Sequence, residues 1–108
     1  MRALTALAVL ALCSCGHDLC GPSPCRNDPM PTAAQVDQCR ASLDQGRGSV
    51  CFPERQRVYT CVAANLVCTS GQTTDVGGSL SNAQSRCSTE SQSYSYCCGS
   101  NPSSAACN

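Results

Sequence analysis

Large hydrophobic residues are sparse along this chain, and where they recur their spacing is that of a helix. The segment Thr32–Gly46 gives the clearest pattern, with three hydrophobic positions at intervals of three and four residues: Val36, Cys39 and Leu43. Thr32 and Gln35 form a Thr-x-x-Gln capping box at its start, and Gly46 stands where a C-terminal cap belongs. The pattern therefore predicts a helix over residues 32–46.

A second helix is predicted from Glu54 to about Val67, because Pro53 suits a first helical position and a hydrophobic stripe follows it. The stripe consists of Val58, Cys61, Val62 and Leu66. The run 58–62 is also rich in β-branched and aromatic residues, which is typical of a strand. A strand therefore remains an alternative for this run.

A third helix is predicted from Ser81 to about Cys98, although serine is a mediocre helix former. Its stripe consists of Ala83, Cys87, Tyr94 and Cys98. A Gly- and Thr-rich loop, Thr69–Leu80, precedes this segment, and a polar tail, Gly99–Asn108, follows it. We expect Cys107 to tie the tail back to the rest of the chain.

Cysteine changes this picture, since 12 of the 108 residues are Cys, a density that marks a disulfide scaffold in a short exported chain. From Cys15 onward only 11 of 94 residues are Leu, Ile, Val or Phe, too few for a conventional hydrophobic core. We therefore expect a small disulfide-rich, mainly α fold with two to three short helices and long loops. Seven basic residues balance seven acidic ones, which argues against a nucleic-acid partner.

The first residues have the pattern of a secretory signal peptide, which we assign to residues 1–14. Met1 and Arg2 form a short basic start, and Ala3–Leu12 is an uninterrupted apolar run. Ten helical residues span about 15 Å, half of a hydrocarbon core of roughly 30 Å, so the run is too short for an ordinary membrane-spanning helix. The chain is therefore expected to be exported.

The sequence Leu12-Cys13-Ser14-Cys15 resembles the lipobox of bacterial lipoproteins, with a Leu three residues before a Cys and a small residue just before it. The resemblance implies that Cys15 is lipidated and becomes the new N-terminus. It also implies a cell-envelope protein, with Gly16 favouring the outer membrane. The alternative is ordinary cleavage near Gly16, which gives a freely secreted cysteine-rich effector, inhibitor or toxin-like module.

Residues 15–32 are rich in proline and lack hydrophobic periodicity, which is typical of an extended tether. We assign residues 15–32 to a lipidated tether and residues 33–108 to a cysteine-rich domain. Cys20 and Cys25 lie within the tether. They either close a small loop with each other or pin the tether to the domain.

Ten cysteines remain after Cys15, and we expect them to form five disulfides in an oxidising compartment. Roughly 900 pairings are possible, and spacing does not choose among them. Adjacent cysteines make a badly strained bridge, so Cys97 and Cys98 should bond to two different partners. The ten are Cys20, Cys25, Cys39, Cys51, Cys61, Cys68, Cys87, Cys97, Cys98 and Cys107.

No catalytic, metal or cofactor site is predicted. His17-Asp18-Leu19-Cys20 resembles the His-Asp-x-Cys motif of secreted phospholipases, but no glycine-rich calcium loop precedes it, so we interpret it as part of the polar tether. His17 is the only histidine available to activate a nucleophile. A zinc site is disfavoured because the cysteines contain no Cys-x-x-Cys pair.

Two Cys-x9-Cys spacings, from Cys51 to Cys61 and from Cys87 to Cys97, are similar to the twin helical hairpins of the mitochondrial intermembrane space. We interpret the similarity as convergent spacing on helices. The expected role is structural or binding, without enzymatic activity. The membrane is the expected partner through the lipid on Cys15, and the sequence does not identify a protein or surface partner. Tyr94 and Tyr96 are the candidate contact patch, while Tyr59 is expected in the core.

Overall fold

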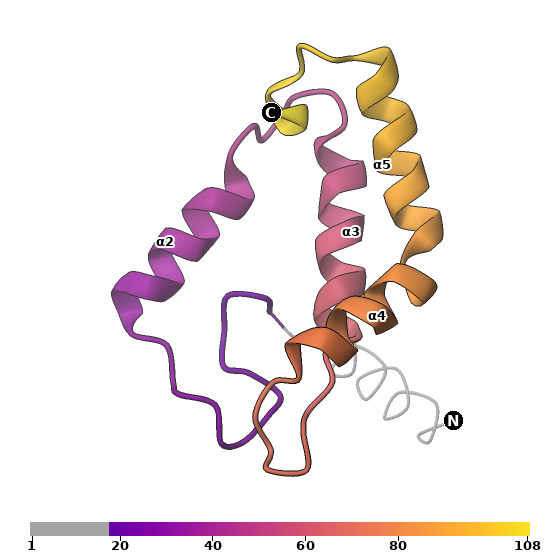
Figure 1. Ribbon diagram of the computed structural model, residues 1–108. Coiled ribbons are helices and arrows are strands. Elements are labelled where there is room, and N and C mark those ends of the chain that lie inside the picture. Colours follow the sequence, from indigo (N-terminus) through magenta and orange to yellow (C-terminus); the bar gives the residue numbers. More distant parts are fainter. Residues whose placement is uncertain (1–17) are drawn as a thin grey trace, which may run out of the picture.

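The computed structural model describes residues 18–108 and is mainly helical (Figure 1). It contains four α-helices, one more than the upper expected number, and a short 3-10 helix near the C-terminus. Helices α3, α4 and α5 pack against one another, whereas α2 stands apart and its disulfide runs to Cys20 in the segment that precedes it. No strand occurs in residues 18–108, which contain only an isolated bridge between Cys68 and Thr74. The helices are α2 (Ala33–Asp44), α3 (Phe52–Ala64), α4 (Val76–Arg86), α5 (Ser88–Ser100) and η1 (Ala105–Cys107).

The capping box of α2 is confirmed, and so is the face that the sequence assigns to the interior. The Thr32 hydroxyl accepts from the Gln35 N–H at 3.2 Å, and the Gln35 side chain accepts from the Thr32 N–H at 2.9 Å. Gly46 follows the helix with a left-handed φ of 80°, which glycine adopts without strain. The half-buried side chains of the predicted stripe are Val36, Cys39 and Leu43, and no residue of α2 is fully buried.

Helix α3 settles the choice between helix and strand for the run 58–62, because the run is helical throughout. The helix begins at Phe52, with Pro53 in its first turn as predicted. It ends at Ala64 rather than Val67. Beyond that point Val67 belongs to the following loop, where its N–H donates to the Ser79 hydroxyl at 2.9 Å.

The predicted third helix is wrong in its boundaries, since residues 76–100 form two helices. Helix α4 begins five residues before Ser81, within the predicted loop, because Asp75 caps it by accepting from the Gly78 N–H at 2.9 Å. The backbone then leaves the helical region at Cys87 (φ −107°, ψ 17°), and α5 continues in a new direction (Figure 1). Cys87 is only 1% exposed and is covalently bonded to α3, so it fixes this corner.

Five disulfides join the ten cysteines between residues 18 and 108. Cys97 and Cys98 bond to different partners, as the adjacency argument requires, so α5 is held to two other segments at once. The small loop that would join Cys20 to Cys25 is wrong, because each of them bonds to a distant residue. The pairs are Cys20–Cys39, Cys25–Cys68, Cys51–Cys97, Cys61–Cys87 and Cys98–Cys107.

Sulfur also forms much of the interior. The largest fully buried side chains of the described residues are all half-cystines: Cys25, Cys51 and Cys87. The main cluster joins Cys51, Phe52 and Ala106, with Tyr94 and the remaining half-cystines of α5 and the tail around them. A core this small buries little apolar surface. The fold therefore depends on crosslinks that restrict the unfolded chain.

Candidate functional site

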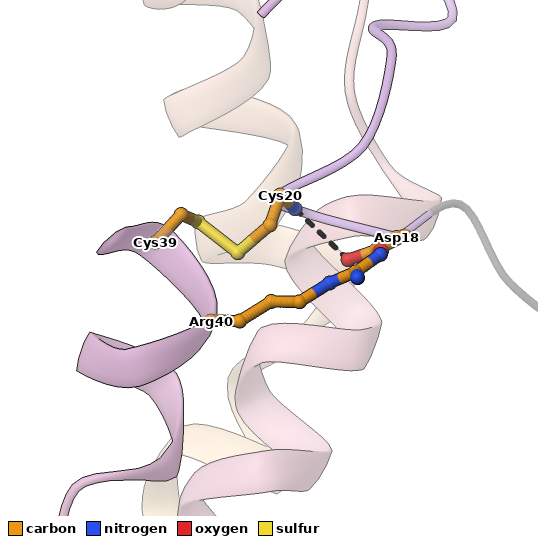
Figure 2. Close-up of polar contacts among 4 residues, drawn as sticks. All are labelled: Asp18, Cys20, Cys39 and Arg40. Carbon is orange, nitrogen blue, oxygen red and sulfur yellow. Dashed lines mark hydrogen bonds and ion pairs between the residues drawn. A yellow bond between two sulfur atoms is a disulfide. The ribbon is translucent and has the colours of Figure 1, made fainter. Parts of the chain in front are cut away.

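The described chain begins with a clamp that fastens it to α2, formed by Asp18, Cys20, Cys39 and Arg40 (Figure 2). The Cys20–Cys39 disulfide is the covalent part. Beside it, the Arg40 guanidinium donates to the Asp18 carboxylate at 2.8 Å. The same carboxylate accepts from the Cys20 N–H at 3.0 Å, and the Asp18 carbonyl accepts from the Gly21 N–H at 3.0 Å, which closes a tight turn. The chain is thus held in position from Asp18 onward.

The electrostatics of the clamp favour the charged form of both side chains. The hydrogen bond from Arg40 holds the pKa of Asp18 below its ordinary value, and the Cys20 N–H lowers it further. The bond to Asp18 in turn raises the pKa of Arg40. About half of each side chain is exposed to solvent, so the ion pair contributes little stability by itself. Its role is to orient the turn around the disulfide.

A pocket of about 180 Å³ lies between the clamp and α3. Leu19 and Leu43 form its apolar side, and Tyr59 and Ala63 of α3 lie opposite them. Tyr59 is half-buried here, so the expectation of a core tyrosine holds only in part. The pocket shows that the first described residues pack near the C-terminal half of α3.

A second anchor holds the same N-terminal segment to the loop between α3 and α4. Cys25 is 1% exposed and bonded to Cys68. Asp28 accepts from the Thr74 N–H at 2.9 Å, and hydrogen bonds from the Ser23 and Thr74 hydroxyls lower the pKa of Asp28. The described part of the predicted tether consists of turns, bends and irregular backbone rather than an extended run, and both of its cysteines are bonded to distant residues.

A buried arginine, which sequence reasoning missed, joins α3 to the end of α2 and to the C-terminal tail. Arg55 of α3 is 5% exposed, and no described acidic side chain forms an ion pair with it. Its guanidinium donates to the carbonyls of Leu43 at 3.2 Å, of Gln45, and of Ala106 at 3.5 Å. The first two carbonyls lie at the C-terminal end of α2, where the helix dipole favours a cation.

Aromatic rings complete the surroundings of Arg55. Its guanidinium carbon lies 5.3 Å from the ring centroid of Phe52 and 5.8 Å from that of Tyr59, within the range of a cation–π contact. The sequence did contain a signal for this site. Positions 52, 55 and 59 share one helical face, so the arginine had to enter the same environment as the two rings.

The predicted Tyr94 and Tyr96 patch is not one surface. Tyr94 packs against the core and its hydroxyl donates to the Ala106 carbonyl, whereas Tyr96 is 81% exposed. They are two positions apart on α5, with one residue between them, which places them on different sides of a helix with 3.6 residues per turn. Tyr96 lines a shallow groove between α3 and α5 together with Arg57 and Gln92.

The sulfur atoms that come close together belong to disulfides. Among the described residues, two groups of side chains each have their sulfur or carboxylate oxygen atoms within 4.8 Å of one another. The groups are Cys51, Cys98 and Cys107, and Cys51, Cys97 and Glu54. All of these cysteines are oxidised, and a disulfide sulfur is not the thiolate that binds a metal. The proximity therefore reflects two neighbouring crosslinks rather than a set of metal ligands.

Two residues singled out by the sequence, Cys15 and His17, lie outside the described residues. No protein-family model, curated protein or solved structure matches this chain. None of the helices between residues 18 and 108 has the length and apolar character that crossing a bilayer requires. The functional proposal therefore rests on the arrangement of the clamp and the disulfides.

Proposed function

We propose that this chain is an exported, disulfide-stabilised protein of a bacterial cell envelope, anchored through a lipid on Cys15 and acting by structure or binding rather than by catalysis. The observation that carries the proposal is the pairing of cysteines. The ten from Cys20 to Cys107 pair among themselves. The disulfide framework is complete without Cys15, which is the residue that the lipobox resemblance assigns to lipid.

The oxidised state supports export, because disulfides form and persist outside the reducing cytosol. A lipid anchor on Cys15 is strong enough to be stable if it carries two or more acyl chains, since each buried methylene contributes about 0.8 kcal/mol and one chain binds only marginally. Asp18 and Asp28 both have lowered pKa values because of local structural hydrogen bonds, whereas a general acid needs a raised one.

The test is the intact mass of protein purified from the membranes of a Gram-negative expression host, before and after reduction. We expect a chain that begins at Cys15, heavier than its sequence by the mass of its acyl chains. Reduction should add ten hydrogens if five disulfides are present. Detergent phase partition should place the protein in the detergent phase.

The matched control is Cys15→Ser, which removes the sulfur that would carry the lipid and leaves the five disulfides in place. This variant should lose the added mass and move to the aqueous phase. A wild-type protein that starts near His17, carries no added mass and stays in the aqueous phase would instead establish the freely secreted module.

A further inference from the structure

The clamp leaves very little chain between Cys15 and the folded domain. Gly16 and His17 alone separate Cys15 from Asp18, and the chain is held by its turn, its ion pair and its disulfide from Asp18 onward. Three residue steps span at most about 11 Å even when fully extended. A free tether over residues 15–32, as the composition predicts, would reach several times as far.

We infer that the domain lies directly against the bilayer, with the face around the clamp turned to the lipid headgroups. The inference rests on the lipid anchor proposed above. A linker of about 11 Å between Cys15 and Asp18 cannot hold the folded domain away from the headgroup layer, because that layer is itself several ångströms thick. The surface nearest to Asp18 must therefore meet the membrane.

The position of the clamp decides which end of the molecule faces outward. The pocket beside the clamp is lined by α3 from Gln56 to Ala63, whereas the first turn of α3, at Phe52, packs on Ala106 of the C-terminal tail. Phe52 and Ala63 are about 16 Å apart along the helix axis. The C-terminal tail thus lies at the far end of α3 from the anchor (Figure 1).

The chemistry of the clamp face fits a bilayer surface that offers headgroups without strong charge selection. Arg40 balances Asp18 and lies close enough to the exposed Asp37 to interact with it, so this face carries a single net negative charge. The other residues that line the neighbouring pocket are uncharged. Such a face neither attracts nor repels anionic lipid strongly. The short linker from Cys15 to Asp18 alone sets the orientation, so the contact between the clamp face and the headgroups should be insensitive to salt.

The test attaches the lipid chemically, so that its result does not depend on processing in a cell. The oxidised chain beginning at Cys15 is coupled through the Cys15 thiol to a maleimide phospholipid in phosphatidylcholine vesicles that contain a headgroup photocrosslinker. Crosslinked peptides are then mapped by mass spectrometry. We expect crosslinks in residues 18–22 and 37–43 and few in residues 101–108, at both low and high salt.

The decisive variant inserts 15 Gly and Ser residues between His17 and Asp18, which lengthens the linker from Cys15 to Asp18 from about 3 to about 18 residues. Effective concentration falls roughly as the −3/2 power of linker length, so crosslinks at the clamp should fall on the order of tenfold. The control adds the same residues after Asn108 and should change nothing at the clamp.

Two outcomes would overturn the inference. The first is crosslinking of residues 101–108 as frequent as that of the clamp peptides, and the second is a clamp signal that the inserted linker leaves unchanged. Failure of the proposed function would look different. It would be the absence of added mass on protein from cells, whatever orientation the chemically anchored domain takes.

Discussion

The two ends of the described chain have similar composition but are held in different ways. Residues 18–32 and residues 99–108 are both polar, and the sequence predicts a tether for the first and a tail tied back by Cys107 for the second. The N-terminal segment is fixed by two disulfides that reach distant residues, with partly exposed polar bonds around them. The C-terminal segment places Ala106 at 0% exposure in the core.

The two segments differ in how much packing and hydrogen bonding accompanies their disulfides. Cys98–Cys107 closes a separation of only 9 residues, and the tail it holds also receives hydrogen bonds from Arg55 and Tyr94. Cys20–Cys39 and Cys25–Cys68 span 19 and 43 residues and hold a segment that buries little besides its own half-cystines. Covalent bonds thus replace packing at one end of the molecule and reinforce it at the other.

Full reduction should have the largest effect, because it should unfold both terminal segments together with the helices. Each native disulfide of a small exported domain contributes about 2 to 5 kcal/mol, and five of them exceed any stability that this small core supplies. We expect loss of cooperative thermal unfolding and of most helical circular dichroism in excess reductant. Retention of a cooperative transition with all ten cysteines alkylated would contradict the role given to the crosslinks.

Removing one disulfide at each end should separate the two regions. Cys20→Ser with Cys39→Ser should cost about 3 kcal/mol by the loop-entropy estimate and release residues 18–24 to rapid amide exchange. Cys98→Ser with Cys107→Ser should cost less and leave the amides of the tail protected, because Ala106 stays packed. Amide hydrogen exchange read by mass spectrometry distinguishes these outcomes, and equal release of both segments would contradict the comparison.

Truncating Arg55 should weaken the junction where α3 meets the C-terminal end of α2 and the C-terminal tail. Arg55→Ala removes the donor to the Leu43 and Gln45 carbonyls and one of the two donors to the Ala106 carbonyl. It also removes two aromatic contacts, so we expect a loss of about 2 to 3 kcal/mol in the free energy of unfolding. Arg57→Ala is the matched control, because Arg57 lies on the same helix but is exposed. It should change stability by less than about 0.5 kcal/mol in denaturant unfolding.

The hydroxyl of Tyr94 should make a smaller contribution at the same end. Tyr94→Phe keeps the ring in the core and removes the hydrogen bond to the Ala106 carbonyl, which should cost about 1 kcal/mol. Tyr96→Phe removes the hydroxyl of an 81% exposed ring and should be neutral. Equal effects of the two substitutions in denaturant unfolding would show that the Tyr94 bond contributes nothing.

The smallest effect is expected from the exposed ion pair at the N-terminal end, through Asp18→Asn. The pKa of Asp18 is lower in the folded than in the unfolded chain, so its contribution is present above the ordinary aspartate value of about 3.9 and is lost as pH falls through the folded value. We expect wild type to exceed the variant by less than about 1 kcal/mol at pH 7. The two should converge in acid unfolding, and a constant difference down to acid pH would contradict this origin.

The sequence predicted the helical class and the local features of α2 because those signals lie within a few residues of one another. Thr32 and Gln35 cap each other across a single turn, and Pro53 marks the start of α3 by its own geometry. The same local reasoning missed the start of α4, where the cap at Asp75 precedes two glycines that resemble a loop. It also missed the corner at Cys87, which a bond to Cys61 in another helix holds in place.

By itself, the sequence determined that disulfides must stabilise this fold, since the scarcity of large apolar residues and the number of cysteines are visible in the composition. It also determined that Cys97 and Cys98 need separate partners, because that follows from bond geometry between neighbours. Only the tertiary structure decided which cysteines pair, how Arg55 is buried, and that the segment after Asp18 is bonded to α2 and to the loop before α4. Each of these depends on residues far apart in the chain, whose meeting depends on how the whole molecule folds.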